Sequence, residues 1–124
     1  MVVDDERDIL SIVKRGLESK KRFQVETFID AESALESLKE NSDNYYDLVL
    51  TDIRMPKING FELYKQIKKI DDKVKVCFLT AGEMDYEKFR KELFSTLDEN
   101  CYIQKPFETE TLIERLNRII ASLD

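Results

Sequence analysis

Histidine is absent from this sequence of 124 residues, and cysteine and glycine are scarce. Histidine is the commonest transition-metal ligand and the usual general base, so its absence excludes histidine-based catalysis and leaves no phosphohistidine within the chain. The two cysteines, Cys77 and Cys101, lie in apolar stretches without the spacing of a disulfide framework, and we expect two small buried residues rather than a redox pair. Three glycines offer little material for a glycine-rich phosphate loop.

Long apolar runs are also lacking. No run approaches the roughly 18 residues that a membrane span requires, and no basic-then-apolar leader opens the sequence. We therefore expect a cytoplasmic protein that does not enter a membrane. Positive charge is in deficit as well, because 20 Lys and Arg residues stand against 26 Asp and Glu residues, for a net charge of −6. This charge would repel a phosphate backbone, so direct binding to nucleic acid is not expected.

The chain length fits one domain, and we expect a single unit over residues 1–124. Five short apolar runs alternate with longer amphipathic segments, which is typical of a parallel sheet covered by helices. The predicted fold class is α/β: a flavodoxin-like (βα)5 three-layer sandwich whose five-stranded parallel sheet has the order 2-1-3-4-5. The first strand is short enough to look truncated.

Apolar runs predict the strands and helical spacing predicts the helices. The runs at 48–50 and 74–79 are nearly continuous, as expected of central strands, whereas the alternation at 23–27 favours an edge strand. Asp30 is a candidate N-cap for the second helix, and Asn59-Gly60 opens the third. A fourth, less regular helix is predicted at 84–97. The remaining predicted elements are strands at 1–3 and 101–104, a first helix with apolar residues from 9 to 17, and a last helix with apolar residues from 112 to 123.

Polar residues follow the apolar runs directly at four predicted strand ends. They are Asp4-Asp5-Glu6, Asp52, Thr80 and Lys105-Pro106. The carboxyl ends of parallel strands meet at one edge of the sheet, which is where ligands bind in this kind of fold. Carboxylates gathered there would repel one another unless a cation lies among them, and hard oxygen ligands without nitrogen or sulfur suit magnesium. Such an ion keeps positions open for phosphate oxygens, so the pattern indicates phosphoryl chemistry.

Four motifs in this order resemble the CheY-like receiver domains of two-component response regulators, over the whole chain. They are VVDDE at 2–6, DIRMP at 52–56 with Gly60, TA at 80–81 and KPF at 105–107. The resemblance implies that Asp52 is the phosphoacceptor of a signalling switch, which takes a phosphoryl group from a sensor histidine kinase, a phosphotransfer protein or a small acyl phosphate. It also implies that the protein catalyses only its own phosphorylation and dephosphorylation.

The resemblance further implies a role for each site residue. Asp5 and Asp52 would bind Mg²⁺ or Mn²⁺ through their side chains, Arg54 through its backbone carbonyl, and Asp4 through a water molecule. Lys105 would pair with Asp52 before phosphorylation and with a phosphoryl oxygen afterwards.

The implied switch lies around the last two strands. The Thr80 hydroxyl would bind the phosphoryl group, and Tyr102 would turn inward in response. The Lys105-Pro106 peptide bond would be cis. The face formed by helix 4, strand 5 and helix 5 would then change for a downstream protein or effector domain, with a homodimer through that face as one option.

The sequence departs from the family pattern in two places. The first strand has fewer apolar residues before the acidic pair, and Lys105 follows Thr80 by 25 residues, a slightly longer separation than usual. Two other functions are alternatives to a phosphorylated switch. A pseudo-receiver, an interaction module that does not cycle phosphate, is disfavoured by the intact Asp52, Asp5, Thr80 and Lys105. An aspartate-nucleophile phosphatase would need a second Asp where Arg54 stands, and a nucleotide-binding enzyme would need a glycine-rich loop after the first strand.

Overall fold

The fold is a five-stranded parallel sheet with helices on both faces. The computed structural model describes residues 1–19, 23–41, 45–80, 91, 101–105 and 108–121. The elements in chain order are β1 (Val2–Val3), α1 (Arg7–Glu18), β2 (Thr27–Phe28), α2 (Ala31–Glu40), β3 (Leu48–Asp52), α3 (Gly60–Ile70), β4 (Lys75–Thr80), β5 (Tyr102–Gln104) and α5 (Thr109–Ala121). The strand order is β2-β1-β3-β4-β5 with parallel pairing throughout, so the predicted fold class and strand order are confirmed.

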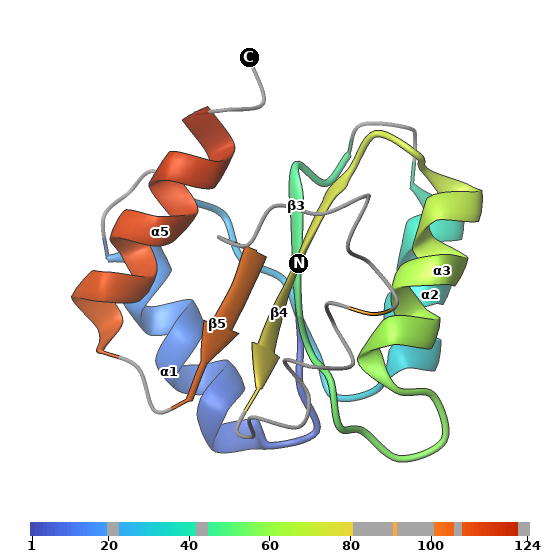
Figure 1. The fold of residues 1–124 in the computed structure, drawn as a ribbon, viewed down its shortest axis with the longest axis horizontal. Coiled ribbons are helices and arrows are strands. Elements are labelled where there is room, and N and C mark those ends of the chain that lie inside the picture. The colour runs from blue at the N-terminus through green and yellow to red at the C-terminus, as the bar shows by residue number, and fades with distance from the viewer. Residues whose placement is uncertain (20–22, 42–44, 81–90, 92–100, 106–107, 122–124) are drawn as a thin grey trace.

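The helices form two layers. In Figure 1, α1 and α5 cover one face of the sheet, and α2 and α3 cover the other. Successive strand residues alternate between the two faces, as the pleat of a strand requires. Val49 and Val76 pack in the cluster under α2 and α3, whereas their neighbours Leu50 and Cys77 pack in the cluster under α1 and α5. The sheet core is therefore buried on both sides, which explains the continuous apolar runs of β3 and β4.

Two helix starts are fixed by local side-chain chemistry. The Asp30 carboxylate accepts a hydrogen bond from the Ser33 N–H at 2.7 Å, and the Asn59 side-chain oxygen accepts one from the Glu62 N–H at 2.9 Å. Each satisfies an N–H group that has no partner within the first helical turn. Both predicted starts are thus confirmed, and the start of α3 fixes the loop that follows β3.

The second strand was placed wrongly by sequence pattern. Residues 23–27 were expected to form it, but β2 is Thr27–Phe28, and its two residues pair with Val2 and Val3. Because β1 has only two residues, it can register only two partners on β2, so most of the alternating stretch lies outside the sheet. Its position at the sheet edge was predicted correctly. The helix expected at 84–97 lies outside the described residues, apart from the helical Lys91.

Cys77 and Cys101 are both buried and form no disulfide, as predicted. Their side chains belong to the cluster under α1 and α5, where they pack as small apolar residues. None of the helices in the described part of the chain has the length and apolar character needed to cross a bilayer.

Candidate functional site

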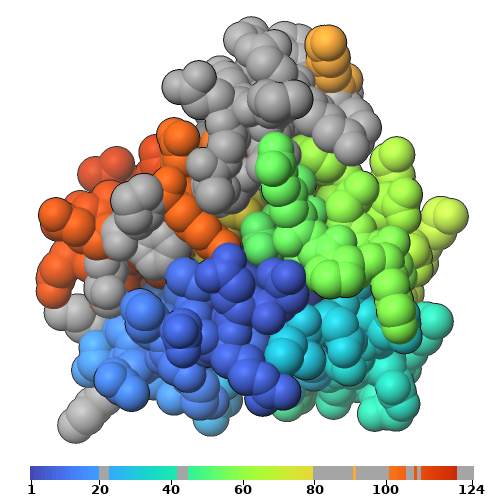
Figure 2. Space-filling view, turned by 90° about the horizontal axis from the view of Figure 1, so that it is seen from below, coloured from blue at the N-terminus to red at the C-terminus, as the bar shows by residue number. Residues whose placement is uncertain are grey.

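The strand register brings the polar strand ends together. Val3 pairs with Thr51, Asp52 with Leu79, and Thr80 with Gln104, so the strands end at nearly the same level. Seen from below in Figure 2, the N-terminal segment (dark blue), the segment after β3 (green) and the segment after β5 (orange) meet at the centre of this face. Residues more than 100 positions apart in the sequence thus become neighbours.

Four carboxylates form an acidic cluster at this edge: those of Asp4, Asp5, Glu6 and Asp52. Each contributes an oxygen, and these oxygens lie within 4.8 Å of one another. Asp4 is completely buried and Asp52 is 6% exposed, whereas Asp5 and Glu6 are exposed. Asp52 lies at the last position of β3, which is buried on both faces, so the fold itself buries this residue.

Lys105 faces the acidic cluster from the end of β5. Its ammonium lies 3.0 Å from Asp4 Oδ2, to which it donates a hydrogen bond, and 3.7 Å from Asp52 Oδ2. A third carboxylate oxygen, Glu6 Oε1, lies 3.9 Å away. The Lys105 side chain is only 12% exposed, so these contacts fix its head group inside the site. The predicted approach of Lys105 to Asp52 is present, but Asp4 is the nearer partner.

The crowding of charge alters proton affinities at the site. Burial raises the pKa of Asp52 to about 6; the negative charge of Asp4, and to a smaller degree that of Asp5, adds to the rise, whereas Lys105 opposes it. Burial by itself would lower the pKa of Lys105. The hydrogen bond to Asp4 and the surrounding carboxylate charges outweigh burial and raise it. Lys105 is therefore a stable cation, whereas the Asp52 carboxylate lacks full compensation of its charge.

The start of α3 is held against the end of β3. The Gly60 N–H donates a hydrogen bond to the Ile53 carbonyl at 2.7 Å. A Cβ atom at Gly60 would lie 2.4 Å from the Asp52 carbonyl oxygen and 2.8 Å from Ile53 Cα. Only glycine allows this close approach of two backbone segments. The loop between β3 and α3 contains Lys57 at φ 69°, a left-handed conformation that is unusual for a residue with a side chain.

The other predicted site residues have different positions. Thr80 ends β4 beside Gln104, but its side chain lies outside the described residues, as does Pro106, so the hydroxyl role and the cis peptide bond stay predictions. Arg54 is exposed and lies two residues beyond Asp52. Tyr102 is 8% exposed and packs in the cluster under α2 and α3. Its turning inward in response to phosphorylation stays a prediction.

One participant was not recognised from the sequence. Glu6 was interpreted only as part of an acidic strand end, yet its carboxylate joins the ion pairs around Lys105. A usable signal existed, because Glu6 occupies the N-cap of α1, a position where Asp, Asn, Ser or Thr is preferred and glutamate is not.

The residues of the site fit a hard divalent cation. The cluster offers four carboxylates, whereas Lys105 supplies a single positive charge against them. Oxygen ligands without nitrogen or sulfur are the donor set that magnesium prefers. Asp5 is the exposed member next to the buried Asp52, so both can present an oxygen to the same ion. A parallel α/β domain with such an acidic cluster and a facing lysine has the architecture of a receiver domain.

Comparisons with known proteins agree on this class. The model of the response regulator receiver domain family matches residues 1–117, and the chain therefore belongs to this family, as a receiver domain of a two-component response regulator. It is 29% identical to the response regulator SaeR of Staphylococcus epidermidis over 123 aligned residues. The alignment covers 99% of this chain and 50% of SaeR. SaeR of Staphylococcus aureus is 28% identical with the same coverage. The chain thus spans about half the length of these curated relatives.

Solved structures show the same relationship. A response regulator receiver domain protein from Clostridium thermocellum superposes with a TM-score of 0.83 at 31% identity, covering 98% of this chain and 92% of that one. The receiver domain of the Francisella response regulator 1452 has a TM-score of 0.81 at 28% identity, covering 99% and 96%. The family predicted from the four motifs is confirmed.

Proposed function

We propose that this receiver domain accepts a phosphoryl group on Asp52, in a Mg²⁺-dependent reaction, from a phosphohistidine of a sensor histidine kinase or phosphotransfer protein. The observation that carries the proposal is the Asp52 carboxylate at the end of β3, with the Lys105 ammonium 3.7 Å away and three further carboxylates around it. A nucleophile, a fixed cation and a set of oxygen ligands for a metal ion are what phosphoryl transfer to a carboxylate requires.

In the proposed step, an Asp52 carboxylate oxygen attacks the phosphorus atom. The new O–P bond forms while the P–N bond to the donor imidazole breaks, and the imidazole leaves as the neutral base after taking up a proton from water. Lys105 moves from its carboxylate partners to an equatorial phosphoryl oxygen, where its charge offsets the charge that builds up in the transition state. The Thr80 hydroxyl donates a hydrogen bond to another of these oxygens.

Asp5 and Asp52 would hold the metal ion through their carboxylates and Arg54 through its backbone carbonyl, with Asp4 acting through a water molecule. A bound Mg²⁺, or Mn²⁺ in its place, supplies positive charge that neutralises phosphoryl oxygens and aligns them with the nucleophile. The excess of carboxylates over ammonium groups at the site supports this assignment. The domain acts on no other substrate, and its catalysis is limited to gain and loss of its own phosphoryl group.

The signal leaves the site through the neighbouring strands. Thr80 ends β4 and pairs with Gln104 on β5, whereas Tyr102 begins β5 and pairs with Phe78, two residues before Thr80. A shift of Thr80 toward the phosphoryl group changes the space next to Tyr102, and with it the face formed by the helix predicted at 84–97, β5 and α5. A downstream protein, an effector domain or a second copy of the chain would bind that face in one state and not in the other.

Intact mass spectrometry tests the acceptor role. After incubation with acetyl phosphate and Mg²⁺, the wild-type protein is expected to gain the mass of one phosphoryl group, and EDTA is expected to prevent the gain. Asp52→Asn should show no uptake, because an amide is not a nucleophile at this site.

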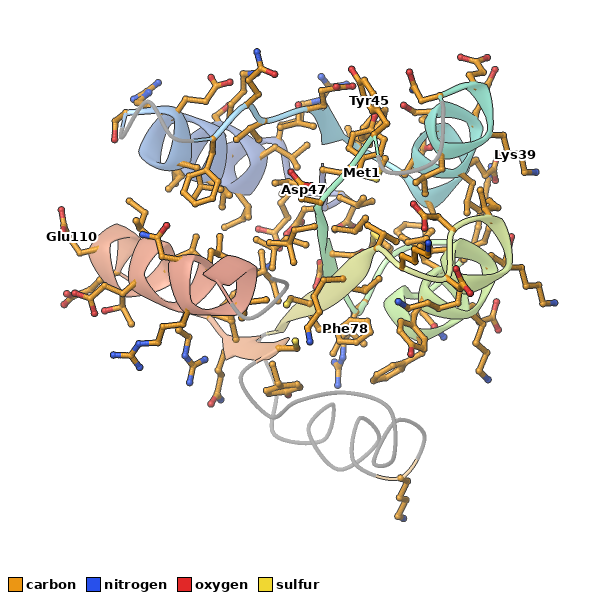
Figure 3. The ribbon with its side chains drawn as sticks, turned by 90° about the horizontal axis from the view of Figure 1, so that it is seen from above. Met1, Lys39, Tyr45, Asp47, Phe78 and Glu110 are labelled. Carbon is orange, nitrogen blue, oxygen red and sulfur yellow. The ribbon has the colours of Figure 1, made fainter. Side chains whose placement is uncertain are left out.

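The control is Asp47→Asn, which removes a carboxylate just before β3, at the opposite end of the strand from Asp52; Asp47 is labelled in Figure 3. It should take up the phosphoryl group like the wild type. A wild-type protein that stays unmodified under these conditions would contradict the proposal and favour a module that does not cycle phosphate.

A further inference from the structure

Glu6 occupies the N-cap of α1 without acting as a cap. Its backbone has the extended conformation of an N-cap residue, but its side chain makes no capping hydrogen bond. The equivalent residues of α2 and α3, Asp30 and Asn59, both cap their helices. Glutamate is a poor N-cap because its longer side chain does not reach the first N–H groups as readily as Asp or Asn does. The choice of residue at position 6 is therefore not explained by a capping hydrogen bond.

The Glu6 side chain lies on the acidic cluster instead. Its Oε1 is 3.9 Å from the Lys105 ammonium. The Glu6 backbone N–H donates a hydrogen bond to Asp4 Oδ1 at 2.9 Å, while the other oxygen of Asp4 accepts a hydrogen bond from Lys105 at 3.0 Å. Residue 6 thus contacts Lys105 directly through its side chain and orients, through its backbone, the carboxylate that binds Lys105 most closely.

The contacts with Asp4 and Glu6 pull the Lys105 ammonium toward β1. Asp52 attracts it in the other direction, toward the end of β3, over 3.7 Å. Coulomb attraction grows as distance falls, and the partly buried position of Lys105 limits screening by water. The balance between the two sides fixes how much of the Asp52 charge is neutralised by the lysine.

We infer that Glu6 is a positioning residue for phosphoryl uptake: together with Asp4, it holds the Lys105 ammonium toward β1 in the resting domain and leaves the Asp52 carboxylate available to the metal ion and the incoming phosphoryl group. The inference rests on the proposed function, because it concerns the readiness of Asp52 for that reaction. Loss of the Glu6 charge lets Lys105 move onto Asp52 and compete with the ion.

Titration of Mg²⁺ by calorimetry tests the inference on Glu6→Gln, which keeps the length of the side chain. The dissociation constant for Mg²⁺ is expected to rise about threefold, the size of effect that a half-exposed ion pair provides. In a crystal structure of the variant, the distance between Lys105 Nζ and Asp52 Oδ2 is expected to fall from 3.7 Å to about 3 Å, the length of a direct hydrogen bond. The matched control is Glu36→Gln, an exposed glutamate on α2, which should bind Mg²⁺ like the wild type.

A double-mutant cycle separates action through Lys105 from a direct effect of the Glu6 charge on the ion. In a Lys105→Met background, Glu6→Gln is expected to change the dissociation constant less than about 1.5-fold, because the coupling partner is gone. An equal fold-change in both backgrounds, or a Glu6→Gln protein that matches Glu36→Gln, would overturn the inference.

The two proposals fail in different ways. A wild-type protein that binds no Mg²⁺ and takes no phosphoryl group from acetyl phosphate contradicts the proposed function itself. A wild-type protein that does both, combined with an unchanged Glu6→Gln variant, contradicts the positioning role of Glu6 alone. Urea unfolding of each variant shows whether the domain is intact, and since the Glu6 side chain makes no capping bond, α1 should not lose stability with it.

Discussion

At the scale of single residues, the close approach of α3 to the end of β3 depends on Gly60. A Cβ atom there would lie 2.4 Å from the Asp52 carbonyl oxygen. The atoms that it would meet belong to the backbone and cannot turn away as a side chain can. We expect Gly60→Ala to lower the free energy of unfolding by about 1–3 kcal/mol, the usual cost of overpacking, and to slow phosphoryl uptake because Asp52 must shift. Urea unfolding and the acetyl phosphate assay measure the two effects.

Gly16 provides the matched control for that substitution. It lies within α1, where alanine has a higher helix propensity than glycine, so Gly16→Ala should leave stability unchanged or raise it by up to about 1 kcal/mol. A Gly60→Ala protein as stable as Gly16→Ala would show that the α3 start can move without strain.

At this scale, contacts between residues close in the sequence could be predicted, whereas the ion pairs between distant residues could not. Asp30 and Asn59 were predictable as helix starts because a cap depends only on residues within one turn. The partners of Lys105 could not be predicted. Three carboxylates from two strand ends compete for its ammonium, and their distances from it differ by less than 1 Å. Sequence motifs locate such a site, whereas its internal pairing depends on side-chain placement.

At the scale of secondary-structure elements, a tyrosine joins α2 to the residue before β2, at the end of the sheet opposite the acidic cluster. The Tyr46 hydroxyl makes hydrogen bonds with Ser37 Oγ at 2.6 Å and with Glu26 Oε1 at 2.9 Å, and its side chain is 7% exposed. Burial raises the pKa of Tyr46 to about 12, so the hydroxyl remains protonated at neutral pH and can donate to Glu26. This network connects α2, the residues before β2 and those before β3.

Tyr46→Phe should therefore destabilise the domain by about 1–2 kcal/mol, since it removes two hydrogen bonds and leaves Ser37 and Glu26 without this partner. The control is Tyr45→Phe. Tyr45, labelled at this edge in Figure 3, also donates to Glu26 but is 51% exposed, so water replaces the lost bond at little cost. Equal stabilities of the two variants in urea unfolding would contradict a structural role for the Tyr46 network.

Strands were predicted well where their burial was complete and poorly where it was not. The runs of β3 and β4 lie between two helical layers, and their continuous apolar character located them within a residue or two. β2 pairs only with the two residues of β1, so residues 23–25 carry a strand-like alternation without joining the sheet, and Glu26 contributes only its carbonyl oxygen, which accepts a hydrogen bond from the Val2 N–H. Pattern reports which side chains face the core, but a strand exists only where a partner supplies hydrogen bonds.

At the scale of the whole molecule, the buried carboxylate of Asp52 links the proposed function to the stability of the fold. Burial and neighbouring carboxylates raise the pKa of Asp52 to about 6, against 3.8 for the unfolded side chain. Between these values the folded domain binds a proton more tightly than the unfolded chain does, so this residue's contribution to stability falls as the pH rises from about 4 to about 6. Above pH 6 the folded protein holds an ionised, incompletely compensated carboxylate, and each unit of pKa difference corresponds to about 1.4 kcal/mol.

Asp52→Asn removes this ionisation while keeping the shape of the side chain. Without metal, at pH 7.5, the variant should be more stable than the wild type by on the order of 2 kcal/mol, and at pH 4.5 the difference should shrink to well under half of that value. Urea unfolding in EDTA at the two pH values measures the difference, in which the titration of groups that do not interact with Asp52 cancels. Excess Mg²⁺ at pH 7.5 should narrow the gap, because an ion bound to the folded wild type stabilises it by mass action. A stability gain that is the same at both pH values would contradict this account. It would mean that ionisation of Asp52 does not lower the free energy of unfolding of the resting domain.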